Sequence, residues 1–589
     1  MQFSQVAEYF SRMEKTPKRL ELTSILSELF SKSGKSVKIL SYLVQGKIAP
    51  DYEGKELYMA DRLIVKGLHE LSGRSEDEID RILARTGDIG SVAEEILQRH
   101  AQKGLFQIDL TLEDVFDSLS KISELRGHGS TNNRVKLYEK MLMNATPLEA
   151  RFITRIITGK LRLGVSDATI LAALEACFDA TDRKESVENA YNFHPDMGYI
   201  ASLLMNGKLE DLDSIGPEPF VPIKVMLAER LPDIDSIIEK MGSKAALEYK
   251  YDGLRTQIHF RDGVVKLFSR SDENVTDQFP DIVENFGRTF NCRSCILDGE
   301  AVPYNPETGE LYPFQMVSQR RGRKYDIEKT RSEIPVVVFL FDVVYLDGKS
   351  YASVPYTSRR ETLENLFKEN DSFKLARRIV TGNHDEVQTF FEQSISDGCE
   401  GLVIKNITES SVYKAGARGW LWIKLKRDYQ SEMADTVDLA VVGAFHGHGR
   451  RKGTYGALLM AVFNDDSQQF QTVCKLGTGF TDDTLRALPK MLQQFRSEEK
   501  PPDVSSNMTP DVWFHPGLIM EVSGAEITLS PVHTCSFGIH RKDSGLSIRF
   551  PRFTGRFRDD KDVFSITKAS EIDEMFMNQK KSSRSDEAQ

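Results

Sequence analysis

Cysteine is scarce in this chain. Six cysteines are scattered over 589 residues, too few for the disulfide framework of a secreted protein of this length. Cys292 and Cys295 form a single CxxC. Because no second CxxC and no spaced pair of histidines completes a zinc site, we interpret these two residues as incidental thiols.

Long apolar runs are also absent. No window reaches the roughly 18 uninterrupted apolar residues that a membrane-spanning helix needs. The N-terminal stretch MQFSQVAEYFSRMEKTPKRLELTSIL is amphipathic and lacks the apolar segment and small-residue cleavage site of a signal peptide. We therefore expect a cytoplasmic protein with no membrane partner, associated with the nucleoid if the source is prokaryotic.

An excess of positive charge, common in proteins that bind nucleic acids, is missing too. The net charge is −11 and the pI is about 5.7. This argues only weakly against such a partner, because phosphate binding depends on where basic residues lie and not on their total. The 77 lysines and arginines are enough to line one face of an acidic protein.

The N-terminal third of the chain has a helical pattern. Apolar residues recur at helical spacing in SVAEEILQRHAQ, DVFDSLSKISEL, TPLEARFITRIIT and DATILAALEACF. Thr146 before Pro147, and Ser166 before Asp167, are typical helix starts. We predict an all-α domain over residues 1–215, ending at the prolines of SIGPEPFVPI.

Two further regions with different secondary-structure patterns follow. Residues 216–427 alternate helices with short β-rich runs such as ALEYKYDGLRTQIHF, CILDGEAVPYN, PVVVFLFDVVYLDG and EGLVIK, which indicate an α+β domain. Residues 428–589 contain short strands with Gly-rich turns, as in DLAVVGAFHGHG and GALLMAVFND, which indicate a small β-barrel. A C-terminal helix, ITKASEIDEMFMNQ, precedes a tail, KKSSRSDEAQ, that we expect to be disordered. The chain is thus multidomain, and its length agrees with three to four domains of roughly 150 residues.

The sharpest chemical signal is EYKYDGLR, a strand-like run that carries Lys250 among charged residues. A lysine attacks only as the neutral amine, so a nucleophilic role requires its pKa to be lowered by burial or by neighbouring cations. Cations occur in LFSRSDENVT, EGLVIKN and WIKLK, where they could also bind nucleotide phosphates. Any one of these basic residues alone is most simply a solvated strand residue. Their occurrence together is not explained in that way.

Taken in order, KYDGLR, LFSRSDENVT, LDGEAV, FLFDVVYLDG, EGLVIK and WIKLK resemble the nucleotidyltransferase motifs of the DNA ligase and mRNA-capping superfamily. RLGVSDATI and PIKVMLAER resemble the DNA-binding domain of ATP-dependent DNA ligases. GTGFTDDTL, AEITLSPVHT and LSIRFPRFTGRFRDDK resemble their OB-fold. The resemblance is to the archaeal and eukaryotic replicative type, the archaeal in particular. It implies a helical DNA-binding domain, an adenylation domain and an OB-fold domain.

The resemblance assigns roles to individual residues. Lys250 matches the nucleophile that attacks the α-phosphate of ATP and carries AMP as a phosphoramidate. Glu248 matches the acceptor for the adenine amino group, which selects ATP over GTP, and Phe341 matches the ring that stacks on adenine. Arg255 and Arg270 match arginines near the ribose and phosphate, where a planar guanidinium pairs well with phosphate oxygens.

Carboxylates and further cations complete the implied ATP site. Glu300 matches a carboxylate on the ribose hydroxyl or the metal, and Glu400 matches a metal ligand. Oxygen ligands beside phosphates suit Mg²⁺, with Mn²⁺ as an alternative. Phosphate-side cations would offset the charge that develops on phosphorus. They are Lys405, Arg418, Lys424 and Lys426.

The stretch FTGRFRDDK resembles the last family motif, which acts from the OB domain and orients the pyrophosphate leaving group. Its charged residues are Arg556, Arg558, Asp560 and Lys561. Some relatives read a shorter RFPRFIRVRED-like stretch, whereas Thr554 and Gly555 intervene here. A shorter signal, Gln102, Leu105 and Phe106 in QKGLF, resembles segments that dock on the sliding clamp PCNA. Its alternative is a helix-to-loop junction with a core leucine and phenylalanine.

The implied activity is sealing of 5′-phosphate/3′-hydroxyl nicks in duplex DNA, in replication, repair and recombination. Lys250 takes AMP from ATP, AMP passes to the 5′-phosphate, and the 3′-hydroxyl displaces it. The first step needs the OB domain over ATP and the later ones need the DNA encircled, so we expect large domain motion. We also expect a monomer that holds the duplex mainly through its phosphates.

Three other functions remain open at this point. An mRNA-capping guanylyltransferase or RNA ligase shares the KxDG core but needs no long helical domain with a RLGVSDATI-like sequence. NAD-dependent ligases carry four-cysteine zinc modules, which this chain lacks. A catalytically dead DNA-binding protein would have no use for Lys250, Glu300, Glu400 and Lys424 together.

Overall fold

The computed structural model describes residues 1–57, 59–99, 109–127, 129–231, 233–242, 244–320, 327–426, 436–447, 454–524 and 526–585. Contacts group the chain into two compact units. One unit comprises Met1–Val225 with Phe268–Asn274, and the other comprises Met226–Leu267 with Val275–Gln589. In the described part, no helix is long and apolar enough to cross a membrane.

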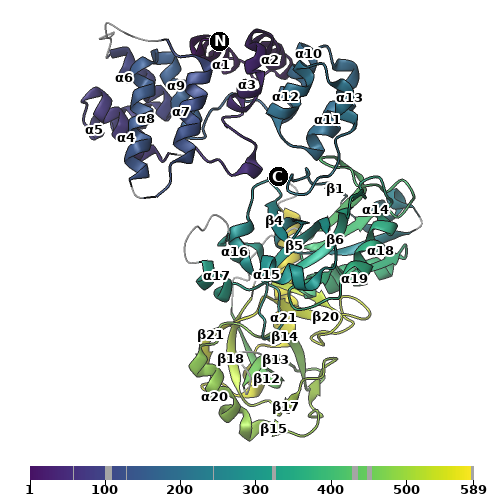
Figure 1. The fold of residues 1–589 in the computed structure, drawn as a ribbon. Helices are drawn as coiled ribbons and strands as arrows, with labels where there is room; N and C mark the ends of the chain where they lie inside the picture. The colour runs from purple at the N-terminus through teal and green to yellow at the C-terminus, as the bar shows by residue number, and fades with distance from the viewer. Residues whose placement is uncertain are drawn as a thin grey trace. The chain divides into compact units, whose positions relative to one another are not determined.

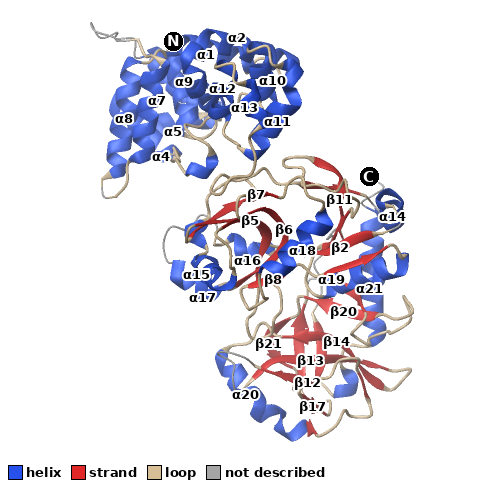
Figure 2. Ribbon diagram, turned by 45° about the vertical axis from the view of Figure 1, so that its right-hand side comes forward, coloured by secondary structure: helices blue, strands red, loops and turns tan. Residues whose placement is uncertain are grey.

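The first unit is helical, as predicted (Figures 1 and 2). Its helices are α1 (Phe3–Met13), α2 (Arg19–Ser33), α3 (Val37–Val44), α4 (Asp61–Ser72), α5 (Glu76–Thr86), α6 (Ile89–Arg99), α7 (Leu112–Glu124), α8 (Ser130–Asn144), α9 (Pro147–Ile157), α10 (Asp167–Cys177), α11 (Lys184–Phe193), α12 (Met197–Met205) and α13 (Leu209–Asp213). Thr146 caps α9 through a capping box with Glu149, which satisfies two backbone N–H groups that the helix itself leaves unpaired. Ser166 occupies the corresponding position before α10, but its side chain makes no capping hydrogen bond.

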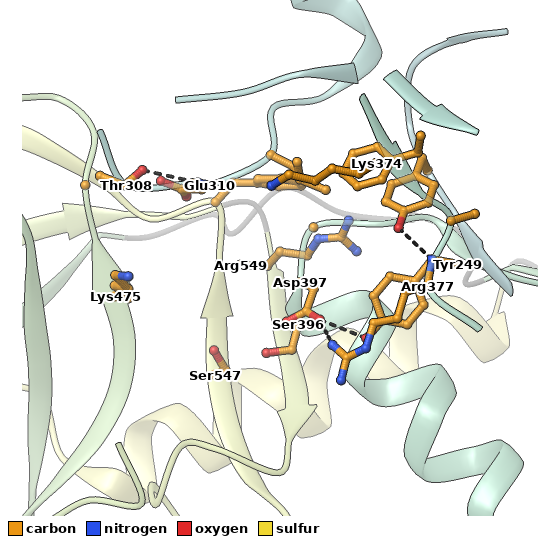
Figure 3. A pocket seen from close by; sticks show the side chains of 18 of the residues that line it. Tyr249, Thr308, Glu310, Lys374, Arg377, Ser396, Asp397, Lys475, Ser547 and Arg549 are labelled. Atoms are coloured by element: carbon orange, nitrogen blue, oxygen red, sulfur yellow. Dashed lines mark hydrogen bonds and ion pairs between the residues drawn. The ribbon is translucent and has the colours of Figure 1, made fainter. Parts of the chain in front are cut away.

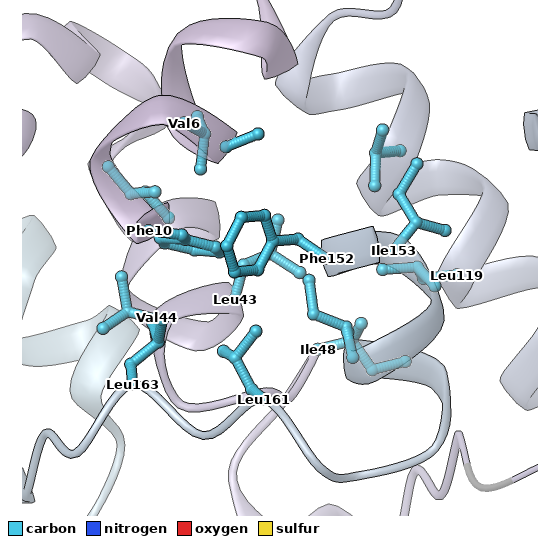
Figure 4. Close-up of a cluster of buried hydrophobic side chains, with 14 of the residues drawn as sticks. Val6, Phe10, Leu43, Val44, Ile48, Leu119, Phe152, Ile153, Leu161 and Leu163 are labelled. Carbon is cyan, nitrogen blue, oxygen red and sulfur yellow. The ribbon is translucent and has the colours of Figure 1, made fainter. Parts of the chain in front are cut away.

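The core of the first unit is built from side chains on the inner faces of these helices (Figure 4). Phe10 of α1 meets Phe152 of α9 edge to face, with the ring centroids 5.4 Å apart. Leu43 of α3 and Leu161, after α9, lie against them. Because each helix contributes an apolar stripe, helices distant in sequence share one core.

Two sheets form the central part of the second unit. The five-stranded sheet has the order β1-β11-β10-β2-β9, and the six-stranded sheet has the order β4-β3-β5-β6-β7 with β8 beside β6. The strands are β1 (Leu227–Arg230), β2 (Ala245–Lys250), β3 (Leu254–Arg261), β4 (Val264–Ser269), β5 (Ser294–Pro303), β6 (Val336–Leu346), β7 (Lys349–Ser350), β8 (Phe373–Leu375), β9 (Arg378–Thr381), β10 (Gly401–Lys405) and β11 (Arg418–Lys426). The helices are α14 (Ile234–Met241), α15 (Pro280–Thr289), α16 (Phe314–Ser318), α17 (Ile327–Glu333), α18 (Tyr356–Leu366) and α19 (His384–Ser396). The predicted α+β class of this region is confirmed.

The C-terminal part is a sheet curled into a half-barrel, consistent with the predicted OB-fold (Figure 1). Its strands β12, β13 and β14 pair in antiparallel order, and β18 and β21 continue from the other edge of β12. The strands are β12 (Val437–His446), β13 (Tyr455–Asn464), β14 (Gln469–Leu476), β15 (Arg496–Ser497), β16 (Val504–Ser505), β17 (Val512–Phe514), β18 (Ile519–Ser523), β19 (Glu526–Ser530), β20 (Gly545–Arg549) and β21 (Arg552–Phe557). The helices are α20 (Asp482–Leu492) and α21 (Ala569–Ser585).

The C-terminal helix extends further than expected. Helix α21 runs to Ser585 and so includes the first six residues of the tail KKSSRSDEAQ, for which we expected disorder. Residues 586–589 lie outside the described part.

Gly401 has no room for a side chain. Its φ is +137°, and a Cβ at this position would lie 2.2 Å from the carbonyl oxygen of Leu425. We predict that Gly401→Ala lowers the free energy of unfolding by more than about 1 kcal/mol, because alanine fits neither the backbone conformation nor the space. Thermal and denaturant unfolding would measure the change.

Gly419→Ala is the matched control for that substitution. Gly419 lies in the neighbouring strand β11, and a Cβ there would meet nothing within 4 Å. Equal losses of stability in the two variants would contradict the steric explanation.

Candidate active site

Strand β10 brings the predicted residues of three strands onto one face. It pairs in antiparallel register with β2 on one side and with β11 on the other. Residues directly opposite each other in such a sheet share a face. The register gives three rows, which are Ala246–Lys405–Trp422, Glu248–Val403–Lys424 and Lys250–Gly401–Lys426.

Lys250 ends β2 in contact with a carboxylate. Its Nζ lies against Glu400, whose carboxylate is also 2.7 Å from Nζ of Lys426. The backbone N–H of Glu400 donates to the carbonyl of Lys250 at 2.8 Å, which fixes the two residues relative to each other. Burial opposes ionisation of Glu400, but Lys250 and Lys426 outweigh it and hold its pKa below the usual value. The predicted nucleophile and a predicted metal ligand are therefore neighbours.

Glu248 lies buried among donors. Its carboxylate is 2.6 Å from Nζ of Lys405 and 3.2 Å from Nη1 of Arg360, and it accepts a hydrogen bond of 2.5 Å from the hydroxyl of Tyr356. Burial lowers the pKa of Lys405, although Glu248 opposes that shift. An ionised carboxylate has about four acceptor positions, so these three donors leave room for one more, such as an adenine amino group.

Aromatic rings lie beside this pair. The ring of Phe341 is 4.9 Å from Nζ of Lys405, and it meets the ring of Trp422 edge to face at 6.2 Å. The indole Nε1 of Trp422 is buried and has no hydrogen-bond partner among the described residues. A buried donor without an acceptor is costly, and a bound nucleotide could supply the acceptor. Sequence reasoning missed Trp422, although it precedes Lys424 and Lys426 at strand spacing in WIKLK.

Arg255 is already engaged by the protein. Its Nε and Nη2 donate to the carboxylate of Asp298 at 3.1 and 2.5 Å, and Nη1 donates to the carbonyl of Met226 at 2.8 Å. The guanidinium therefore ties β3 to β5 and to the start of the second unit. Two fork donors face Asp298, so Arg255 is less free to pair with a phosphate than the sequence suggests.

Glu300 stands opposite Arg255 in the pairing of β3 with β5. Burial raises the pKa of Glu300 to about 7, with Lys250 and Arg255 opposing the shift. No group of three or more His, Cys, Asp or Glu in the described residues is arranged to hold a metal. Mg²⁺ commonly takes only one or two carboxylates beside substrate phosphates. Glu300 and Glu400, both near Lys250, fit that donor set only together with a nucleotide.

The other predicted residues are more dispersed. Lys424 is partly buried opposite Val403, and Arg418 is exposed at the start of β11. Arg270 is exposed in the segment 268–274, which belongs to the first unit. Gln102, Leu105 and Phe106 lie outside the described residues.

The charged residues of FTGRFRDDK pair within the C-terminal part. Arg558 donates to Asp438 at 2.7 Å and to both carboxylate oxygens of Asp560 at 2.9 Å. Lys561 also contacts Asp438, at 2.6 Å, and Arg556 lies 3.7 Å from Glu521. The arrangement described here thus holds these residues on their own sheet and not at Lys250.

A cavity of about 730 Å³ lies behind β2 (Figure 3). Tyr249 lines it and, because side chains alternate along a strand, faces away from the side of Lys250. The opposite wall comes from the C-terminal part, including Lys475, Ser547 and Arg549. The cavity is therefore distinct from the face that carries Lys250.

Comparison with known proteins identifies the family. The family described as "ATP dependent DNA ligase domain" matches residues 225–426, "DNA ligase N terminus" matches 2–175, and "ATP dependent DNA ligase C terminal region" matches 451–561. The chain is 56% identical to a DNA ligase of Thermoplasma volcanium, over 99% of both chains. It is 46% identical to DNA ligase 2 of Thermofilum pendens, over 98% of both chains.

A solved structure described as "mycobacterial DNA ligase D complexed with ATP and MES" is 25% identical, with a TM-score of 0.27, and covers 58% of this chain and 97% of that chain. The sequence matches carry the assignment. The protein is a member of the ATP-dependent DNA ligase family. It is an enzyme that uses ATP and joins DNA strands, with an adenylation domain between the helical region and the OB-fold.

The raised pKa of Glu300 predicts a pH-dependent stability. The folded protein holds this proton up to about pH 7, whereas the ordinary value is 4.5. The contribution of Glu300 to stability is thus fully present below pH 4.5 and is lost as the pH rises through about 7. Glu300→Gln cannot titrate, so we expect the variant to gain stability relative to wild type between these two pH values.

Denaturant midpoints of both proteins at about pH 5 and about pH 8, without nucleotide or metal, measure this difference. A difference between wild type and Glu300→Gln that stays constant with pH would contradict the buried, protonated state of Glu300.

Proposed function

We propose that Lys250 is the residue that takes up AMP. Its amine attacks the α-phosphorus of ATP, the N–P bond forms, and the bond from phosphorus to the pyrophosphate oxygen breaks. The amine must lose its proton to solvent before the attack, and Glu400, in contact with Nζ, positions the amine. This contact, at the end of β2 and beside Lys426, is the observation that carries the proposal.

Adenine recognition is assigned to Glu248 and Phe341. Glu248 keeps one acceptor position for the adenine amino group, where a guanine carbonyl would be repelled. Lys405, which we expected on the phosphate side, has its Nζ buried against the Glu248 carboxylate, so we assign it to fixing Glu248 from the neighbouring strand. Phe341 offers its ring to the base.

Phosphate-side charge is assigned to Lys424, Lys426 and Arg418 on β11, with Arg255 and Arg270 near the ribose and phosphate. Glu300 and Glu400 would hold Mg²⁺, or Mn²⁺ in its place. The metal would supply positive charge to the phosphates. The protein's part is to keep the carboxylates beside Lys250.

The later steps are assigned to the whole chain, with a DNA-binding domain at 1–215, an adenylation domain at 216–427 and an OB-fold domain at 428–589. AMP moves from Lys250 to the 5′-phosphate of a nick, and the 3′-hydroxyl then displaces it. Arg556, Arg558, Asp560 and Lys561 would orient pyrophosphate during the first step. We further propose a cytoplasmic monomer that docks on the sliding clamp through Gln102, Leu105 and Phe106.

Incubation with ATP labelled on the α-phosphate tests the assignment of Lys250. We expect wild type to carry label through a denaturing gel and to lose it to nicked duplex DNA. Lys250→Ala should carry none, because the phosphoramidate cannot form. The same variant should still seal a nick that is supplied already adenylated, since the last step needs no lysyl-AMP.

That second arm is the folding control. Loss of sealing on the adenylated nick would mean that the substitution damages the fold. Label retained by Lys250→Ala would refute the assignment, and label from GTP but not ATP would favour a capping-type activity.

Phe341→Leu tests the base contact. Leucine keeps an apolar side chain but removes the ring, and stacking of a base on an aromatic ring contributes about 1–3 kcal/mol. We expect the KM for ATP in lysine adenylation to rise about fivefold or more, with a smaller change in kcat. An unchanged KM would contradict the stacking role.

A further inference from the structure

The turn that carries Arg270 is tightly closed. Phe268 bridges to Asn274 across it, the backbone N–H of Ser269 donates to the carbonyl of Glu273 at 2.9 Å, and that of Asp272 donates to the carbonyl of Ser269 at 3.0 Å. Asp272 has a φ of +64°, the left-handed conformation that Asp and Asn tolerate better than most residues. The position of one residue in this turn therefore constrains the others.

Arg270 and Asp272 point to different surroundings. Arg270 is exposed, whereas the Asp272 side chain is only 4% exposed. The buried carboxylate lies 2.7 Å from Nζ of Lys224, which precedes strand β1. Burial raises the pKa of Asp272, and Lys224 opposes that shift. The other carboxylate oxygen, Oδ1, has no hydrogen-bond partner among the described residues, so Lys224 is the main compensation for this buried charge.

Lys224 is itself held by the helical part of the first unit. Its Nζ is 3.7 Å from Asp167, the first residue of α10, and 5.3 Å from the centre of the Tyr191 ring. Its backbone N–H donates to the carbonyl of Asn192 at 2.8 Å. Asp167 in turn accepts hydrogen bonds from Gln45 at 2.9 Å and from the Tyr191 hydroxyl at 2.7 Å. The turn is thereby linked to α3, α10 and α11 through one lysine.

We propose that Lys224 and Asp272 are positioning residues that hold the turn 268–274, and with it Arg270, in one position. The lysine fixes the turn on the helical region, so the position of Arg270 depends on that region. This inference rests on the phosphate-side role proposed above for Arg270. Removing one member of a buried ion pair leaves the other charge uncompensated, so either substitution releases the turn.

The test uses the full-length protein and single-turnover assays of two steps, lysine adenylation from ATP and AMP transfer to nicked duplex DNA. Asp272→Asn suits the left-handed backbone and removes only the charge. We expect Asp272→Asn and Lys224→Met to slow the step that Arg270→Ala slows, by about twofold to thirtyfold. Combined with Arg270→Ala, each should add little further loss, because it acts through Arg270.

Lys224→Arg guards against a merely structural effect. It retains the charge and should restore most of the lost rate, whereas a packing defect at this position would not be rescued by the larger guanidinium. Lys184→Met is the matched control, because Lys184 is an exposed lysine of the same unit, 3.8 Å from Glu188. We expect it to leave both steps at the wild-type rate.

Amide hydrogen exchange over residues 268–274 reads the turn directly. We expect faster exchange there in Lys224→Met and Asp272→Asn, and wild-type exchange in Lys184→Met. Unchanged exchange, or losses that add in full to that of Arg270→Ala, would overturn the inference. If Arg270→Ala slows neither step, the proposed role of Arg270 fails and the positioning role fails with it. The exchange measurement does not depend on the role of Arg270. It therefore shows separately whether Lys224 and Asp272 hold the turn.

Discussion

The pairing of β10 with β2 on one side and β11 on the other is the constraint on which the rest of the site depends. It sets Lys250, Glu248, Lys405, Lys424 and Lys426 on one face without any contact between their side chains being required. Only glycine permits this pairing at position 401, because the carbonyl of Leu425 occupies the place of a side chain. Backbone geometry thus precedes electrostatics in assembling the centre.

The charges then adjust to one another. Glu248 is buried beside Lys405 and Arg360. Glu400 lies between two lysines, which hold its pKa below the usual value. Glu300 has weaker compensation and tends to keep its proton. Glu300 and Glu400 therefore differ in pKa because their neighbours differ, which is how a single fold holds groups of different acidity together.

The sequence predicted those helices and strands well that are specified by residues close together in the chain. Thr146 with Glu149, and the apolar runs of β5 and β6, mark their elements by pattern alone. The ordered motifs also contain residues that the fold brings into contact, such as Lys250, Glu400 and Lys426. The sequence motifs could not show which side chains pair with each other. The contacts of Arg255 with Asp298 and of Asp272 with Lys224 join segments that meet only in the folded protein. Trp422 escaped notice because a strand tryptophan is ordinarily a core residue.

Under the role proposed for Arg558 and Lys561, their pairing with Asp438 has a consequence for how the OB-fold engages ATP. These cations already have an anion, so engaging the nucleotide means exchanging a carboxylate for a phosphate. Such an exchange releases few ions to the solvent, unlike the neutralisation of a bare DNA backbone. Closure over ATP would therefore respond weakly to ionic strength, whereas DNA binding would weaken steeply as salt rises. Added salt would thus slow nick sealing much more than lysine adenylation.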